Sequence, residues 1–299
     1  MMNQNSITLS AHAKINLFLD ITGRRPDGYH TITGIMHAVG LCDHVTISAT
    51  PKAQGETSIT LTCDNPNLPT DSKNLGYRAA EAYLKATAGN LPPMDIAIDI
   101  QKRIPAAAGL AGGSTDAAAV LRGLYILTGE PMTEAALREV GLTLGADVPF
   151  CLAGGTQMTQ GVGEQLTPLP LLPNCPMVVA CGGEGVSTPW AYKALDEMYQ
   201  NFDGTHYSPQ TDHLTAQLQA LQAGDIEGIA QNAYNIFESV VLPNHPTARH
   251  IKAVMQQNHA LLSMMSGSGP SVFGIFPSQT AALSTVYALK DMNIPAWVV

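Results

Sequence analysis

The sequence predicts an α/β (α+β) fold in two domains, on three observations. Stretches in which apolar and polar residues alternate indicate half-buried strands, and stretches with apolar residues three or four positions apart indicate amphipathic helices. The two kinds of stretch follow one another along the chain. A proline-rich stretch then separates two halves, because proline fits neither a helix interior nor a central strand: Pro168, Pro170, Pro173 and Pro176. We therefore expect domains at 1–167 and 168–299.

The elements of the two halves are predicted from these periodicities. The N-terminal half should hold strands at 15–21, 45–47, 59–61 and 94–100, and helices at 75–86 and 115–127. The C-terminal half should hold helices at 214–223, 226–239 and 247–257, and strands at 178–181 and 272–276.

Composition excludes several classes of protein. The 299 residues include 15 Lys and Arg against 24 Asp and Glu, so no basic stripe can neutralise a nucleic-acid backbone. The first residues are polar, and no apolar run reaches the roughly 18 residues of a membrane span. The five cysteines form no C-x-x-C pair, which argues against a disulfide framework or zinc site. We expect a cytoplasmic protein with a small-molecule partner, and neither nucleic acid nor membrane as partner.

A glycine-rich segment at 105–117 lies between an expected strand and an expected helix. Its glycines permit positive φ angles and close backbone approach: Gly109, Gly112 and Gly113. Residue types that cap a helix start follow them: Ser114, Thr115 and Asp116. Free amides and the positive end of the helix dipole would then face an anion such as phosphate. The segment lacks the lysine of a P-loop and the glycine order of a dinucleotide fold, and a merely flexible connection stays an alternative.

Four segments together resemble the motifs of the GHMP kinases, named for galactokinase, homoserine kinase, mevalonate kinase and phosphomevalonate kinase. The first motif is similar to 13–17 (A-K-I-N-L), and the second to the glycine-rich segment. The catalytic aspartate segment is similar to 145–149 (G-A-D-V-P), and the third motif to 265–270 (M-S-G-S-G-P). This order implies the two-domain GHMP kinase fold, with ATP and substrate in a cleft between the domains. The sequence departs from the family pattern at three alanines: Ala106, Ala107 and Ala111.

The resemblance also implies phosphoryl transfer from ATP with Mg²⁺. Asp147 would accept the proton of the substrate hydroxyl, and Lys14 would keep that aspartate ionised and stabilise charge on the transferring oxygens. Asn16 shares a strand face with Lys14 and should bind substrate. By resemblance alone, Asn74 and Lys102 join the adenine side. The remaining ATP-binding candidates form the glycine-rich segment: Pro105, Ala106, Ala107, Ala108, Gly109, Leu110, Ala111, Gly112, Gly113, Ser114 and Thr115.

Two further segments narrow the resemblance within the family. Residues 25–30 (R-P-D-G-Y-H) and 185–192 (G-V-S-T-P-W-A-Y) resemble kinases that phosphorylate the 2-hydroxyl of a sugar alcohol carrying cytidine diphosphate, in non-mevalonate isoprenoid synthesis. Tyr29 and Tyr192 are candidates to stack on the cytosine, and His30 to read its edge. A core role stays an alternative for both tyrosines. The third motif supplies further substrate-binding candidates: Gly267, Ser268 and Gly269.

Other functions remain open. The chain could be another GHMP small-alcohol kinase, of the mevalonate or homoserine type, although such substrates carry no base for Tyr29 and His30. It could also be a non-catalytic GHMP-fold sensor, against which the pair Lys14 and Asp147 argues. No carboxylate in the motifs is an obvious Mg²⁺ ligand, so the hydroxyl of Ser114 or Thr115 is the candidate, with bound phosphates completing the shell. The oligomeric state is not predicted.

Overall fold

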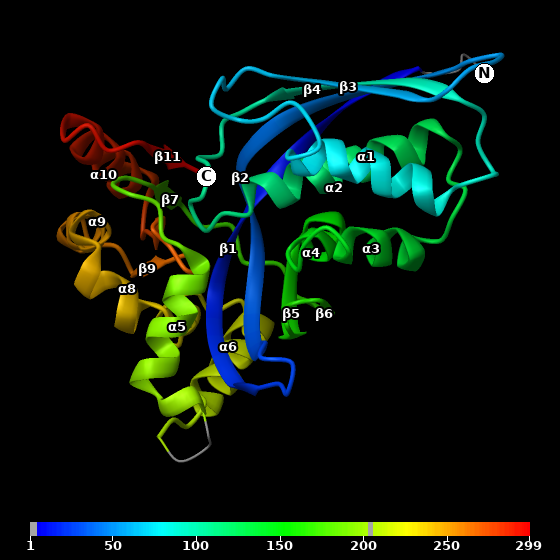
Figure 1. The fold of residues 1–299 in the computed structure, drawn as a ribbon. Helices are drawn as coiled ribbons and strands as arrows, with labels where there is room; N and C mark the ends of the chain where they lie inside the picture. Colours follow the sequence, from blue (N-terminus) through cyan, green and yellow to red (C-terminus); the bar gives the residue numbers. More distant parts are fainter. Residues whose placement is uncertain (1–4, 203–205) are drawn as a thin grey trace. The chain divides into compact units, whose positions relative to one another are not determined.

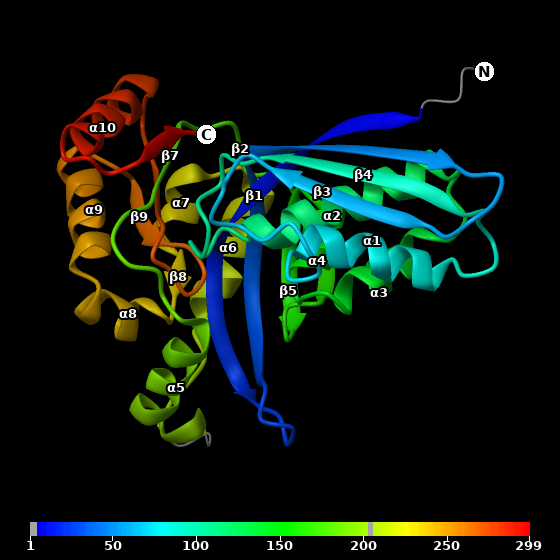
Figure 2. The same cartoon turned by 45° about the horizontal axis from the view of Figure 1, so that its top comes forward.

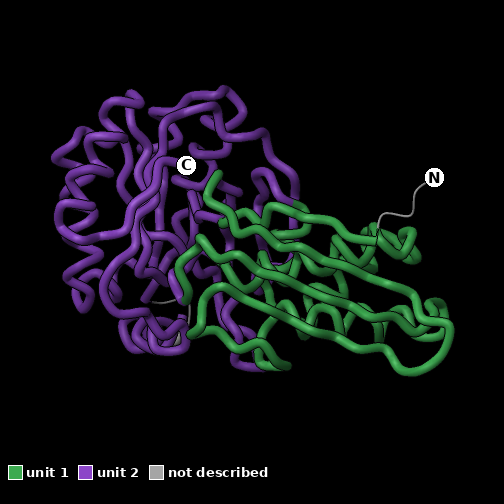
Figure 3. The backbone as a smooth tube through the Cα atoms, turned by 90° about the horizontal axis from the view of Figure 1, so that it is seen from above, with its two compact units in different colours: residues 1–13, 40–106, 111–153 green, residues 14–39, 107–110, 154–299 purple. Residues whose placement is uncertain are grey.

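The computed structural model describes residues 5–202 and 206–299. Its contacts divide the chain into two compact units that are interleaved along the sequence (Figure 3). Unit 1 comprises residues 1–13, 40–106 and 111–153, and unit 2 comprises residues 14–39, 107–110 and 154–299. Figure 1 shows the long strands β1 (Ser6–Arg24) and β2 (His30–Pro51). Both strands contribute residues to both units. The predicted domains 1–167 and 168–299 divide the chain at one point in the sequence, and this division stays a prediction.

Unit 1 is a sheet covered by helices on one face (Figure 2). Strand β2 pairs antiparallel with β4 (Met94–Gln101), which pairs parallel with β3 (Ser58–Cys63). Buried and exposed residues alternate along β4, as a half-buried strand requires. Its core joins the apolar face of this sheet to that of the helices. The helices are α1 (Leu75–Ala86), α2 (Gly112–Leu127), α3 (Glu134–Leu142) and α4 (Val148–Ala153).

Unit 2 contains two groups of strands. In the first, β1 pairs parallel with β8 (Tyr234–Asn235), while β2 pairs with β5 (Thr156–Gly161) and β5 with β6 (Gln165–Leu169). The second is an antiparallel sheet in the order β11–β7–β10–β9. Its strands are β7 (Met177–Ala180), β9 (Leu262–Met265), β10 (Val272–Ile275) and β11 (Ala296–Val298).

Helices α9 and α10 pack on this second sheet and share a buried core with it. The helical elements of unit 2 are α5 (Thr188–Met198), the 3₁₀ turn η1 (Gln200–Phe202), α6 (Thr211–Ala223), α7 (Ile226–Gln231), α8 (Glu238–Asn244), α9 (Pro246–Gln257) and α10 (Gln279–Asp291). Among the described residues, no helix is long and apolar enough to span a membrane.

Most of the predicted elements are confirmed, and each expected strand lies within an observed strand or overlaps its end. Pro168 lies inside β6, which pairs with β5 alone, and an edge strand tolerates the missing donor of proline. The helix expected at 115–127 begins earlier, at Gly112. The elements outside the predictions include short ones, such as β11 and α4, and also the longer helices α3, α5 and α10.

The single helix expected at 226–239 is wrong. The chain leaves α7 at Gln231, forms the two residues of β8, and starts α8 at Glu238. Tertiary hydrogen bonds cause the break: Ile236 N donates to the Leu19 carbonyl of β1. The side chain of Asn235 is bonded to backbone elsewhere in unit 2. Helical periodicity describes local preference, and long-range pairing overrides it here.

Candidate active site

In unit 2, the strand β1 presents Lys14 and Asn16 on one face, as their spacing predicts. The Lys14 ammonium donates to Asn16 Oδ1 at 2.7 Å, and the residues are 4% and 1% exposed, respectively. Among the described residues of unit 2, Lys14 has no carboxylate partner. A buried cation with a neutral partner is a group that an anionic ligand would stabilise.

The tip of the glycine-rich segment, residues 107–110, docks on the third motif within unit 2. Ser271 N donates to the Ala108 carbonyl at 3.2 Å, and Ser266 Oγ donates to the Gly109 carbonyl at 3.1 Å. Lys14 N donates to the Leu110 carbonyl at 3.1 Å. These bonds bring together the tip, the third motif and the strand of Lys14.

Close backbone approach explains two glycines of this cluster. Gly109 has φ +75°, and a methyl group on it would collide with the Ser266 carbonyl. A methyl group on Gly267 would lie 3.3 Å from Lys14 Nζ and 3.1 Å from the Gly109 carbonyl oxygen. The third motif therefore passes directly beside the Lys14 ammonium.

Two of the three alanines that depart from the family pattern adopt conformations that glycine prefers. Ala107 has φ 52° and Ala111 φ 60°, both in the left-handed region. Ala106 and Ala107 are exposed, so their methyl groups meet solvent rather than packed protein. A loop of this shape is thus formed even where alanine replaces glycine.

The segment 185–192 also lies beside this cluster in unit 2. Thr188 and Ser268 share a hydroxyl–hydroxyl hydrogen bond of 2.9 Å. A methyl group on Gly185 would lie 3.6 Å from Ala107. The segment therefore connects the start of α5 to both the loop tip and the third motif.

The structure brings His30 and Tyr192 together and leaves Tyr29 apart. The rings of His30 and Tyr192 stack with centroids 4.8 Å apart and planes at 22°. His30 Nε2 lies 2.7 Å from Asp196 Oδ1. Tyr29 is 66% exposed, in the turn between β1 and β2. Asp196 was missed from sequence, although it lies four residues after Tyr192 on one helix face.

In unit 1, Lys102 is held by two carboxylates. Its ammonium lies 2.5 Å from Asp43 Oδ2 and 2.6 Å from Asp116 Oδ2, and all three side chains are at most 8% exposed. Asp43 Oδ1 also accepts from the backbone N–H groups of Arg103 and Ile104. The pair Asp43 and Asp116 was missed from sequence, because no local spacing connects residues on β2 and α2.

The protonation of this trio is set by burial and by charge. Burial raises the pKa of Asp116 to about 7, against the opposing influence of Lys102. Burial alone would lower the pKa of Lys102, but the two carboxylates outweigh it and the pKa is raised. Among the described residues, Asp116 Oδ1 has no hydrogen-bond partner, whereas Asp43 Oδ1 has two. We therefore place the proton on Asp116 and not on Asp43.

The start of α2 corrects the predicted cap. The N-cap residue is Ala111, which has no side chain that could accept a hydrogen bond, and Gly112 and Gly113 are helical. Thr115 Oγ1 instead donates to the His12 carbonyl at 2.8 Å and is buried. The first amides of α2 are left without a side-chain cap, which suits a phosphate ligand.

The other candidates of unit 1 lie near this helix start or cap another helix. A methyl group on Gly145 would lie 4.0 Å from Ser114 Oγ, so the serine faces the segment that carries Asp147. Asp147 is half-buried, and its carboxylate makes no hydrogen bond or ion pair with the described residues of unit 1. Asn74 is the N-cap of α1, with Oδ1 accepting from Gly76 N and Nδ2 donating to the Pro69 carbonyl.

Comparison with known proteins agrees with this arrangement. Models of the GHMP kinases N terminal domain and of the GHMP kinases C terminal match residues 74–155 and 217–294. The 4-diphosphocytidyl-2-C-methyl-D-erythritol kinase of Nostoc punctiforme is 43% identical over 97% of this chain and 92% of its own length. The chain belongs to the GHMP kinase family.

Other relatives of this GHMP kinase carry the same name. The enzyme of Caldicellulosiruptor saccharolyticus is 43% identical over 94% of this chain and 92% of its own length. A crystal structure of 4-(cytidine 5'-diphospho)-2C-methyl-D-erythritol kinase is 32% identical, covers 98% of both chains and has a TM-score of 0.78. The predicted two-domain GHMP kinase fold of the α/β class is thereby confirmed. The prediction that the chain is an ATP-dependent kinase is confirmed as well.

Gly109→Ala tests the docking of the loop tip. The added methyl group should push residues 107–110 off the third motif and lower kcat/KM for ATP by about 10-fold or more, because small misplacements of binding groups are costly. Steady-state release of ADP measures this.

Gly129→Ala is the matched control for Gly109→Ala. Gly129 has φ +79°, close to that of Gly109, but nothing lies within 4 Å of an added methyl group. Both variants should carry the same backbone strain of roughly 1 kcal/mol, and only Gly109→Ala should lose activity. Equal kinetics in the two variants would show that docking of the tip is irrelevant to ATP.

Asp116→Asn tests the protonation of the buried trio. From pH about 4 to about 7, folded Asp116 keeps a proton that the unfolded chain has released, so its contribution to stability falls as pH rises. The variant lacks this titration. Its free energy of unfolding, relative to the parent, should therefore increase between pH 5 and pH 8 in urea titrations.

Asp291→Asn, at an exposed position at the end of α10, serves as the control for that comparison. Its difference from the parent should stay nearly constant over the same range. A constant difference for Asp116→Asn as well would contradict the assigned proton.

Proposed function

We propose that this kinase transfers the γ-phosphoryl group of ATP to the 2-hydroxyl of 4-diphosphocytidyl-2-C-methyl-D-erythritol, in the non-mevalonate route to isoprenoid precursors. The relatives at 43% identity, which are 4-diphosphocytidyl-2-C-methyl-D-erythritol kinases, support the substrate. The observation that carries the chemistry is Lys14, a buried ammonium beside Gly267 whose partner in its own unit is the neutral Asn16. Such a charge is available to phosphate oxygens.

The transfer requires few groups. A bond forms between the 2-oxygen and the γ-phosphorus, the bond from that phosphorus to the β–γ bridging oxygen breaks, and ADP leaves. We assign the proton of the hydroxyl to Asp147, whose carboxylate is uncommitted within unit 1. Lys14 stabilises charge on the transferring oxygens, and Asn16 orients both the lysine and the substrate.

ATP would bind through the glycine-rich segment. The uncapped amides of α2 suit its phosphates, and the exposed Ala106 and Ala107 border the loop. Asn74 and Lys102 remain candidates for the adenine side, although the side chains of both already have partners. Gly267, Ser268 and Gly269 are assigned to the substrate.

Mg²⁺ is expected to accompany ATP. Among the described residues, no three His, Cys, Asp or Glu side chains cluster to hold a metal ion. Nucleotide-bound Mg²⁺ takes most of its ligands from phosphates and water, so one or two protein oxygens suffice. Ser114 fits this role better than Thr115, whose buried hydroxyl already donates to His12. When bound, the ion neutralises charge on the phosphates.

Recognition of cytosine is supported by the contact between His30 and Asp196. In the tautomer that donates from Nε2 to Asp196 Oδ1, Nδ1 is left as an acceptor. An acceptor matches the amino group of cytosine and not the carbonyl that uracil has in its place. Tyr29 is exposed and available to stack on the base, whereas one face of Tyr192 is covered by His30. A cytoplasmic location stays a prediction.

Asp147→Asn tests the proton acceptor. The amide keeps the shape of the carboxylate but cannot take the proton, so kcat should fall by roughly 100-fold or more while binding of substrate persists. Release of ADP with the cytidine substrate measures turnover. Asp212→Asn, an exposed position in the first turn of α6, should keep parental turnover. Near-normal kcat in Asp147→Asn would reassign this aspartate to a structural role.

The preference for cytosine tests the substrate. The parent should use the cytidine compound with kcat/KM about 10-fold or more above its uridine analogue, because a mismatched base leaves polar groups unpaired. It should show little activity on methylerythritol phosphate, mevalonate or homoserine.

Three variants separate the contributions to this preference. His30→Ala should erode the preference, and Asp196→Asn should do so as well, because an amide no longer selects one tautomer of His30. Tyr29→Ala should instead weaken binding of both compounds. Equal kcat/KM for the cytidine and uridine compounds in the parent would refute the cytosine pocket.

A further inference from the structure

Asn235 joins β8 to the third motif of unit 2. Its Nδ2 donates to the Met265 carbonyl at 2.7 Å and to the Gly267 carbonyl at 2.9 Å. Its Oδ1 accepts from Phe237 N at 3.0 Å. The residue is 4% exposed, so its amide is fully used within the protein. Both of its donors hold the backbone on either side of Ser266.

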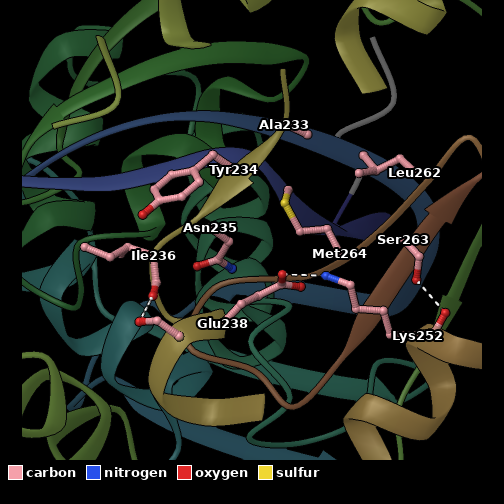
Figure 4. Close-up of a pocket in the computed structure, with 10 residues that line it drawn as sticks. Ala233, Tyr234, Asn235, Ile236, Glu238, Lys252, Leu262, Ser263 and Met264 are labelled. Atoms are coloured by element: carbon pink, nitrogen blue, oxygen red, sulfur yellow. Dashed lines mark hydrogen bonds and ion pairs between the residues drawn. The ribbon is translucent and has the colours of Figure 1, made fainter. Parts of the chain in front are cut away.

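Glu238, one turn later on α8, holds the same segment from a second position. Its Oε1 accepts from Met265 N at 2.8 Å, and its Oε2 lies 2.5 Å from the Lys252 ammonium of α9. Figure 4 shows the Glu238 and Lys252 side chains pointing toward one another. The N–H and the carbonyl of Met265 are therefore bound by two side chains from one short stretch of chain, 235–238.

On one side, Asn235 and Glu238 border a cavity. A cavity of about 220 Å³ is lined by residues of β8, α8, α9 and β9, including Asn235, Glu238 and Met264 (Figure 4). Such a space has room for several waters, each of which takes about 30 Å³ in the liquid. Residues 264–267 are buried, and Met264 and Met265 also pair with β10, so on the side of the cavity the hydrogen bonds with Asn235 and Glu238 add to that packing.

We propose that Asn235 and Glu238 are positioning residues for the reaction, because they fix the backbone that passes beside Lys14. Gly267, one of the residues held by Asn235, is also the residue whose added methyl group would lie 3.3 Å from Lys14 Nζ. A shift of this backbone would move the lysine's surroundings and the Gly109 carbonyl together. This inference rests on the proposed function for its effect on turnover, but the effect on the backbone can be measured without it.

Asn235→Asp is the first test, performed on the full chain. A carboxylate of the same size cannot donate to the two carbonyl groups and places negative charge against them. Backbone amides in 264–269 should exchange hydrogen about 10-fold faster or more, and kcat should fall by about 10- to 100-fold with a smaller change in KM for ATP. Asn258→Asp is the matched control, since Asn258 donates to the Val254 carbonyl at 2.9 Å outside the third motif.

Glu238 gives a second test that does not depend on the folding of Asn235→Asp. Glu238→Gln keeps an oxygen that accepts from Met265 N, whereas Glu238→Leu removes it. Exchange in 264–269 should be faster and kcat lower in Glu238→Leu, and Glu238→Gln should recover most of both. Thermal unfolding of each variant identifies any general loss of stability.

The outcomes separate the inference from the proposed function. Unchanged exchange in Asn235→Asp and Glu238→Leu would overturn the inference, and so would faster exchange with parental kcat. Faster exchange with a lower kcat, absent in Asn258→Asp, would establish it. A parent without turnover on any of the alcohols would defeat the proposed function instead, and hydrogen exchange alone would then decide whether these residues hold the backbone.

Discussion

The active-site arrangement of unit 2 depends on backbone hydrogen bonds among three segments that are far apart in sequence. Lys14, Ala108 and Ser271 mark these segments, and each is bound to another through main-chain groups. Such bonds use main-chain atoms and do not depend on the side chain, so a loop with alanine at positions 107 and 111 keeps its course. They demand close approach, however, and this confines glycine to the few positions, such as Gly109, where a methyl group would collide.

The two buried lysines illustrate how partners divide structural from chemical work. Lys102 lies between Asp43 and Asp116, so its charge is compensated within unit 1 even when Asp116 is protonated. Among the residues of unit 2 that the structure describes, Lys14 has only the amide oxygen of Asn16 as a partner, and its charge is uncompensated there. A buried charge without a counter-charge is costly, and proteins retain such groups where a ligand supplies the missing charge. Lys14 is therefore the better candidate to bind phosphate, and Lys102 serves chiefly to stabilise the fold.

Sequence predicted the parts of this molecule that local patterns determine. The strand of Lys14 and Asn16, their common face and the helix at 75–86 follow from periods of two and 3.6 residues. Motif resemblance added the glycine-rich segment and the third motif. What failed depends on long-range contacts: the pair Asp43 and Asp116, and the break of the helix expected at 226–239. No window of sequence contains the partners that produce either.

That break is where local preference yields to the site. A continuous helix through 226–239 would satisfy its own amides, but it would leave the carbonyls of Met265 and Gly267 without the donors that Asn235 supplies. The chain accepts a two-residue strand instead, and asparagine, which favours turns over helix interiors, suits that position. The departure from helical periodicity and the placement of the third motif thus have the same cause. A short stretch in which the periodicity fails indicates residues whose contacts serve the site.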